Sequence, residues 1–148
     1  MLEHGGRLRE AAARYGIPLR SWHDLSTGIS PQAFPIPSIP RIVWQRLPEE
    51  NDGLELAASA YYQNKNVLPV AGSQAAIMAI PRLFIGMKAG IGHELNIACL
   101  GPLYAEHPHA WLNAGHHVTT YTHANLEAAA QTQDVVVVCN PNNPTAEM

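Results

Sequence analysis

Lysine is scarce in this chain of 148 residues, which holds two, Lys65 and Lys88. Lys and Arg together number 9 against 12 Asp and Glu, and the formal net charge is -3. A chain with so few cations has no basic face with which to hold polyanions. Nucleic acid and anionic membrane surfaces are therefore poor partner candidates, and we expect neither.

Cysteine and long apolar runs are scarce as well. Cys99 and Cys139 both stand inside apolar, strand-like runs, where the expected role is that of a small buried hydrophobe, ahead of a disulfide or a nucleophilic thiol. No apolar run approaches the length of a membrane span, and the N-terminus lacks the basic and then apolar stretches of a signal peptide. We expect a cytoplasmic protein that does not enter a membrane.

The chain has eight histidines, but their spacing is not that of a metal site. His107 and His109 are two residues apart on an expected helix, so they do not share a face. His116 and His117 stand together in a polar turn, as does His123. These side chains are interpreted as solvated or structural, and no metal site is expected.

Helical and strand patterns alternate along the rest of the chain. Five prolines between Ser30 and Pro48 exclude regular ladders there and indicate an arm, with a short helix at 39–46. Strands that alternate with helices favour parallel βαβ units and an α/β fold. The expected helices are 7–15, 54–62, 73–84, 105–114 and 126–131, and the expected strands are 67–70, 97–100, 118–121 and 135–139.

A run of four valines leads into an Asn-rich turn near the end of the sequence. The valines after Asp134 are typical of a parallel strand covered on both faces, and such sheets bind ligands beyond the carboxyl ends of their strands. Asn142 and Asn143 follow this strand. Because Pro144 keeps Asn143 out of the helical region, its amide projects in a fixed direction and suits a hydrogen bond to a planar ligand.

Two more segments are expected at the same edge of the sheet. Gly72 ends a strand and Ser73 is a candidate N-cap, so N–H groups at this helix start, including that of Gln74, can attract an anion such as phosphate. On these residues alone, a plain capped helix is the alternative. Tyr104 follows the next strand, where its ring can stack on a flat heterocycle or pack against the rim of the core.

These segments together resemble a known family. Asn140-Pro141-Asn142-Asn143-Pro144-Thr145 is similar to the Asn-Pro-Asn-Asn-Pro-Thr-Gly turn of the aspartate-aminotransferase superfamily, whose members use pyridoxal 5'-phosphate and share the type I fold. Further segments follow in the order typical of the threonine-phosphate decarboxylase branch, which serves cobalamin biosynthesis. They are His4-Gly5-Gly6, Tyr15 to Pro18, Asp24 to Pro31, Ala71 to Ala76 and Gly101 to His107.

The resemblance implies a fold and a division of the chain. The fold is part of the type I large domain, three-layer α/β/α with a mostly parallel sheet, preceded by an N-terminal arm. Residues 1–48 would form the helix and arm, and residues 49–148 the first part of the cofactor-binding domain. In that fold, strands that come later in the sequence, and are absent here, lie between the strand at 67–70 and the valine strand. We therefore expect a gap between the strand at 67–70 and the other three strands. We also expect the valine strand to be an exposed edge of the sheet.

The resemblance also implies site roles. Gly72, Ser73 and Gln74 would grip the phosphate of pyridoxal 5'-phosphate, Tyr104 would cover its pyridine ring, and Asn143 would bond the ring hydroxyl oxygen. His4 would lie near the phosphate of the substrate, and Gly28 against its carboxylate.

The sequence departs from the family pattern at two places. Leu47-Pro48 stands where many relatives have Tyr-Pro, which puts a phosphate contact across the dimer in doubt. Ala146 replaces the usual Gly, so we expect that the last residue of the turn does not need a positive φ.

The catalytic groups of the family all come later than the Asn turn. These groups are the Schiff-base Lys, the Asp at the pyridine nitrogen and the Arg for the substrate carboxylate. The chain is therefore expected to be an N-terminal portion, without catalytic residues of its own, of an enzyme that is a homodimer when full length. The implied reaction converts a small phosphorylated amino acid, L-threonine O-3-phosphate, to aminopropanol phosphate. A histidinol-phosphate-type aminotransferase and a non-catalytic remnant are the alternatives.

Overall fold

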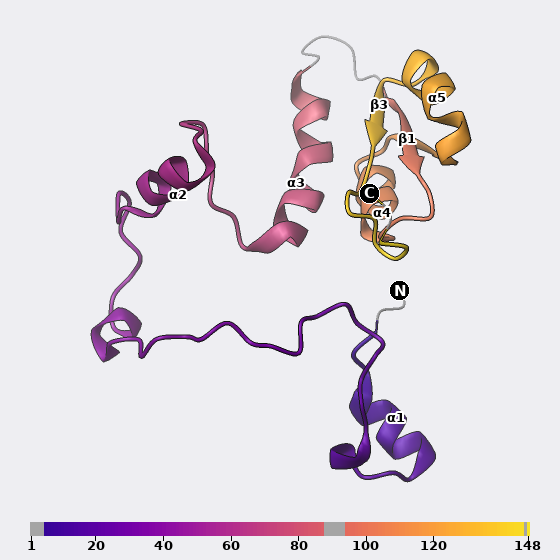
Figure 1. The fold of residues 1–148 in the computed structure, drawn as a ribbon. Helices are drawn as coiled ribbons and strands as arrows, with labels where there is room; N and C mark the ends of the chain where they lie inside the picture. The colour runs from indigo at the N-terminus through magenta and orange to yellow at the C-terminus, as the bar shows by residue number, and fades with distance from the viewer. Residues whose placement is uncertain (1–4, 88–93, 147) are drawn as a thin grey trace. The chain divides into compact units, whose positions relative to one another are not determined.

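The computed structural model describes residues 5–87, 94–146 and 148. The predicted positions His4 and Lys88 lie outside these residues. The chain divides into two units, Met1–Asp52 and Gly53–Met148 (Figure 1).

The first unit holds one α-helix among its described residues. This helix, α1 (Leu8–Tyr15), ends at Gly16, whose left-handed φ of 66° lets its N–H bond the carbonyl of Ala12. Short 3₁₀ turns follow at Leu19–Ser21 and Arg41–Trp44. The predicted helix 7–15 is confirmed, and the short helix expected at 39–46 is a single 3₁₀ turn.

A small hydrogen-bonded turn joins two parts of this unit. The N–H of Gly6 donates to Ser26 Oγ (2.8 Å), and Ser26 Oγ in turn donates to Asp24 Oδ1 (2.6 Å). The Ser26 hydroxyl and then its N–H lower the pKa of the Asp24 carboxyl, because both bonds favour the charged form. A side chain at Gly5 would collide with the Ser26 carbonyl, so only glycine fits there.

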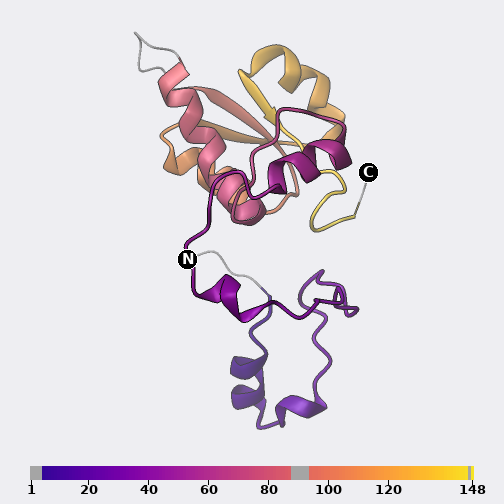
Figure 2. The same ribbon diagram turned by 90° about the vertical axis from the view of Figure 1, so that its left-hand side faces the viewer.

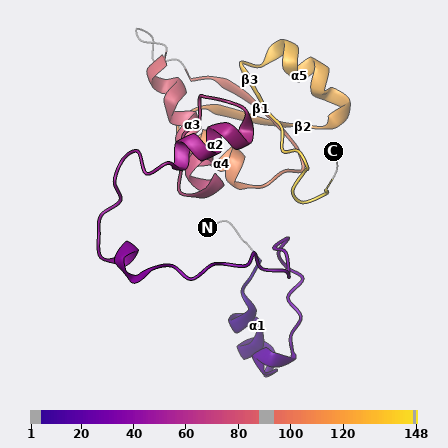
Figure 3. The ribbon, with the colours of Figure 1, turned by 60° about the vertical axis from the view of Figure 1, so that its left-hand side comes forward.

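The second unit is an α/β structure built on a parallel sheet. The strand order is β2-β1-β3, with both pairs parallel (Figure 3). The predicted alternation of helices and strands is confirmed from residue 72 onward. The strands are β1 (Asn96–Leu100), β2 (His117–Tyr121) and β3 (Val135–Val137), and the helices are α2 (Leu54–Tyr62), α3 (Gly72–Met87), α4 (Glu106–Asn113) and α5 (Leu126–Thr132).

The core lies around the central strand. α3 and α4 lie on one face of the sheet and α5 on the other (Figure 2). For α4 and α5 the reason is the topology: the connections β1–α4–β2 and β2–α5–β3 cross the sheet in opposite directions, so right-handed crossovers place their helices on opposite faces. Ile97 and Cys99 of β1 are fully buried, and Trp111 of α4 packs on them with its ring 5.6 Å from that of Phe84 of α3.

Two strand predictions need correction. The prediction of a strand at Val67–Val70 is wrong. The segment forms no ladder with β1, β2 or β3, and Leu68 is 79% exposed. A strand is stable only with a neighbour to take its hydrogen bonds, and this segment has none among the described residues. The valine strand ends at Val137, earlier than predicted, and is half-buried because it lies at the edge of the sheet. The strand covered on both faces is β1, while the expected edge position of the valine strand is confirmed.

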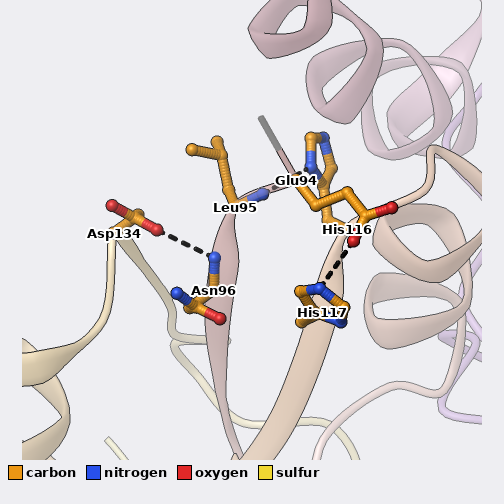
Figure 4. A network of polar contacts seen from close by, with 6 residues as sticks. All are labelled: Glu94, Leu95, Asn96, His116, His117 and Asp134. Carbon is orange, nitrogen blue, oxygen red and sulfur yellow. Dashed lines mark hydrogen bonds and ion pairs between the residues drawn. The ribbon is translucent and has the colours of Figure 1, made fainter. Parts of the chain in front are cut away.

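A buried histidine ties three elements together at the amino edge of the sheet (Figure 4). The N–H of Leu95 donates to His116 Nδ1 (3.2 Å), so His116 Nε2 carries the proton and donates to the carbonyl of Pro81 in α3 (3.1 Å). The structural role predicted for His116 is thus supported, but it is 5% exposed and not in a solvated turn. His117 beside it is exposed and lies 2.6 Å from the Glu94 carboxylate.

Candidate functional site

The loop after β1 occupies the centre of the candidate site. It begins at Gly101, whose N–H donates to the carbonyl of Tyr121 at the end of β2 (2.7 Å). A Cβ at Gly101 would lie 2.5 Å from Cγ2 of Thr120, so glycine is required for this close approach. The loop therefore leaves the sheet tightly against β2 and carries Pro102 and Tyr104 to the carboxyl edge.

The Asn turn after β3 is bonded to this loop. Nδ2 of Asn142 donates to the carbonyl of Pro102 at 2.7 Å, across 40 residues of sequence. Asn142 is 7% exposed, whereas Asn143 is exposed. The two segments that sequence reasoning placed at one edge of the sheet are thus in contact, through the asparagine to which it gave no separate role.

The turn closes with an unfavourable backbone conformation. The N–H of Ala146 donates to the carbonyl of Asn142 (2.7 Å), and Ala146 has a φ of 59°. The expectation that this residue does not need a positive φ is wrong. The hydrogen bond that closes the turn requires the left-handed conformation, which alanine adopts at a cost of about 1–2 kcal/mol.

The predicted phosphate turn lies at the start of α3. The helix begins at Gly72, one residue before the predicted start, so Ser73 lies in the first turn and is not its N-cap. Gly72 has a φ of 80° with open space where a Cβ would point, and its N–H donates to the carbonyl of Val70 (2.7 Å). The N–H groups of Ser73 and Gln74 remain at the positive end of the helix dipole.

A side-chain hydrogen bond connects this helix start to α4. Nε2 of Gln74 donates to the Glu106 carboxylate at 2.9 Å. Glu106 stands in the first turn of α4, directly after the loop that holds Tyr104. Sequence reasoning quoted Glu106 in a motif but missed this role, for which an acidic residue in a first helical turn is the available signal.

Tyr104 is half-buried just before α4. Its ring lies edge-on to that of His107, at a centroid distance of 6.2 Å and an angle of 84°. Desolvation lowers the pKa of His107, which favours the neutral imidazole beside the tyrosine. The start of α3, the loop after β1 and the Asn turn are therefore linked in series by the Gln74–Glu106 and Asn142–Pro102 bonds.

Gly28, the one predicted substrate residue that the structure describes, belongs to the first unit. Gly28 is exposed, and a Cβ on it would meet nothing within 4 Å. In the part of the chain that the structure describes, no group of three or more His, Cys, Asp or Glu is placed to hold a metal ion. No helix among the described residues is both long and apolar enough to cross a membrane.

Comparison with known proteins identifies relatives along the whole chain. No protein-family model matches it. A protein of Pseudomonas aeruginosa named threonine-phosphate decarboxylase is 55% identical over 148 residues, which is all of this chain and 42% of that protein. The chain is homologous to threonine-phosphate decarboxylases. A second threonine-phosphate decarboxylase, from Sinorhizobium sp, is 39% identical over 146 residues, or 96% of this chain and 41% of the relative. The chain thus spans about two fifths of the length of the curated threonine-phosphate decarboxylases that it matches.

Proposed function

We propose that the chain is the N-terminal part of a threonine-phosphate decarboxylase that binds pyridoxal 5'-phosphate. The observation that carries the proposal is 55% identity to a protein of that name over all 148 residues. The full-length protein would remove the α-carboxylate of L-threonine O-3-phosphate and so supply aminopropanol phosphate for cobalamin biosynthesis. By the same resemblance it would be a cytoplasmic homodimer of the lyase class.

The donor set of the site suits this cofactor. The start of α3 offers backbone N–H groups and a positive dipole end to a phosphate, without a charged side chain. Because Glu106 engages the Gln74 amide, Gln74 would hold the phosphate through its backbone N–H, together with Ser73. One buried acceptor, Asn142 Oδ1, has no hydrogen-bond partner among the described residues, so the site is not complete in itself.

The residues of this chain would bind and orient the cofactor, while the rest of the protein would supply the reactive lysine. When bound, pyridoxal 5'-phosphate provides an electron sink for the bond that breaks at the substrate Cα. Tyr104 would cover one face of the ring, and Asn143 would donate its amide N–H to the ring hydroxyl oxygen. His4 and Gly28 would contact the phosphate and carboxylate of the substrate.

An assay on the full-length protein, by which we mean this chain with its continuation, tests the reaction. Release of carbon dioxide from L-threonine O-3-phosphate is expected. Amino transfer to or from histidinol phosphate, without carbon dioxide release, would instead support the aminotransferase alternative. Absence of both would favour a non-catalytic remnant.

Cofactor binding by variants tests the site. In the full-length protein, Tyr104→Ala and Asn143→Ala should each weaken pyridoxal 5'-phosphate binding by about tenfold, the effect of losing roughly 1.4 kcal/mol of contact. Tyr62→Ala, which removes an exposed tyrosine of α2, is the matched control and should bind as wild type does. Unchanged binding in both site variants would contradict the assignment.

The 148-residue chain on its own should not form a covalent link to the cofactor. Lys65 lies in the exposed turn after α2 and so follows none of the strands β1, β2 and β3, and the sequence places Lys88 in a Gly-rich connection. Borohydride reduction with pyridoxal 5'-phosphate and peptide mapping should therefore leave no lysine labelled in stoichiometric amount. A single fully labelled lysine would overturn this expectation.

A further inference from the structure

Asn142 and Asn143 are neighbours with opposite environments. Asn143, the predicted cofactor contact, is exposed at the surface of the turn, whereas Asn142 is 7% exposed. Asn142 therefore acts through contacts within the protein, and these contacts determine the position of Asn143.

Asn142 holds the turn at two points. Its backbone carbonyl accepts the N–H of Ala146 (2.7 Å), which closes the loop that contains Asn143. Its side-chain Nδ2 donates to the carbonyl of Pro102 (2.7 Å), two residues before Tyr104. The closed loop is therefore attached to the segment that carries the predicted ring-stacking tyrosine.

The orientation of the Asn142 amide is determined by this contact. Rotating the amide by half a turn would set Oδ1 against the Pro102 carbonyl, and two acceptors repel each other. In the observed orientation Oδ1 is buried and finds no partner among the described residues. A buried acceptor that stays unpaired costs free energy. The bond from Nδ2 to the Pro102 carbonyl is therefore the contact that sets this orientation.

We propose that Asn142 is a positioning residue, whose side chain sets the separation between Asn143 and Tyr104 and so the geometry of the cofactor site. The inference rests on the proposed function, because it assumes that Asn143 and Tyr104 contact pyridoxal 5'-phosphate. It assigns no contact with the reacting atoms to Asn142 itself.

Two substitutions separate positioning from folding. Asn142→Ala removes the bond to Pro102 and also removes the unpaired acceptor. Pro102 is exposed, so water can take over its carbonyl. Asn142→Asp keeps the shape but replaces the donor with an oxygen that faces the Pro102 carbonyl. Asn66→Asp, at an exposed position in the connection between α2 and α3, introduces the same charge and is the matched control.

The experiment uses the full-length protein and two readouts. Fluorescence titration should show that pyridoxal 5'-phosphate binds about tenfold or more weakly to both Asn142 variants, and the pH midpoint of the visible absorption of the bound cofactor should shift as the Asn143 contact loosens. Thermal melting of the cofactor-free Asn142→Ala protein should lie within a few degrees of wild type. Asn66→Asp should match wild type in both readouts.

The outcomes distinguish the inference from the proposed function. Wild-type affinity and absorption in both Asn142 variants would overturn the inference alone. Loss of the folded state in both variants would also overturn it, since the role of Asn142 would then be structural. If wild type binds no cofactor, the proposed function falls and the inference falls with it.

Discussion

At the scale of single residues, the two cysteines show how burial decides chemistry. Both are free thiols. Cys99 is fully buried in β1, and burial raises the pKa of its thiol to about 11, because desolvation disfavours the thiolate. Cys139 is half-buried after β3, where its thiol lies 3.6 Å from the carbonyl of Pro141. The role of small buried hydrophobe that the sequence predicts is confirmed for Cys99.

Alkylation should therefore distinguish the two thiols. At pH 8, iodoacetamide should modify Cys139 at least tenfold faster than Cys99, since the thiolate is the nucleophile and Cys99 stays protonated and covered. Mass spectrometry of digested protein measures both rates. In urea the rates should converge, and equal rates in the native protein would contradict the buried position of Cys99.

Ala146 offers a second test at this scale. Ala146→Gly should raise the free energy of unfolding by about 0.5–1 kcal/mol, because glycine adopts a φ of 59° without strain but loses more backbone freedom on folding. Ala130→Gly, on the exposed side of the helix α5, should lower it by about 1 kcal/mol. Denaturant unfolding of the full-length protein measures both. A loss of stability in Ala146→Gly would show that the turn does not carry this strain in solution.

At the scale of elements, hydrogen bonds at the amino ends of the strands hold the sheet together and join it to α3. At the amino edge, Asp134 accepts the N–H of Asn96 (2.9 Å) and its own N–H donates back to the Asn96 carbonyl (2.9 Å), which aligns β3 with β1. His116 joins α3 to the residue before β1. The carboxyl edge is left for the loops of the candidate site.

Substitution of His116 should loosen this edge. His116→Phe leaves the N–H of Leu95 and the carbonyl of Pro81 without their partner, and we expect a loss of about 2–4 kcal/mol in the free energy of unfolding. The exposed His23 provides the control His23→Phe, which should change stability by less than about 0.5 kcal/mol. Thermal and urea unfolding of the full-length proteins measure the difference. Equal stability of the two variants would mean that the His116 bonds do not form in solution.

At the scale of the whole molecule, much apolar surface stays uncovered. Leu56 and Tyr61 of α2 are 77% and 81% exposed, and Leu68 in the segment before α3 is 79% exposed. β3 is an edge strand made of valines, which offers unpaired backbone groups to any other chain. Among the residues that the structure describes, the buried core centres on β1 and α4 and is small.

The 148-residue chain in isolation should therefore be marginally stable or should aggregate. Size-exclusion chromatography with light scattering is expected to show associated species, and urea unfolding a broad transition at low denaturant. Coverage of the same surfaces in the full-length protein should remove both effects. A monodisperse 148-residue monomer that unfolds in one cooperative step would contradict this prediction.

The sequence by itself determined most elements and the class of the fold. Helix periodicity, the Gly16 stop and the apolar runs are local signals, so α1, α2, β1 and β2 fall within a residue or so of the expected ranges. The Asn turn and the Gly72 turn were likewise identified from local turn chemistry. These features depend on residues that are close in the sequence, so the sequence alone is enough to predict them.

Tertiary structure alone decided the rest. Val67–Val70 is apolar enough for a strand, yet without an adjacent strand it stays irregular. The bonds of Asn142 to Pro102 and of His116 to Pro81 join residues 40 and 35 positions apart, and no periodicity reports such partners. Ala146 adopts a left-handed φ because closing the turn onto Asn142 requires it, against the preference of the residue itself. Local preferences determine which helices and strands form. Contacts between segments distant in the sequence determine which backbone and side-chain conformations are adopted.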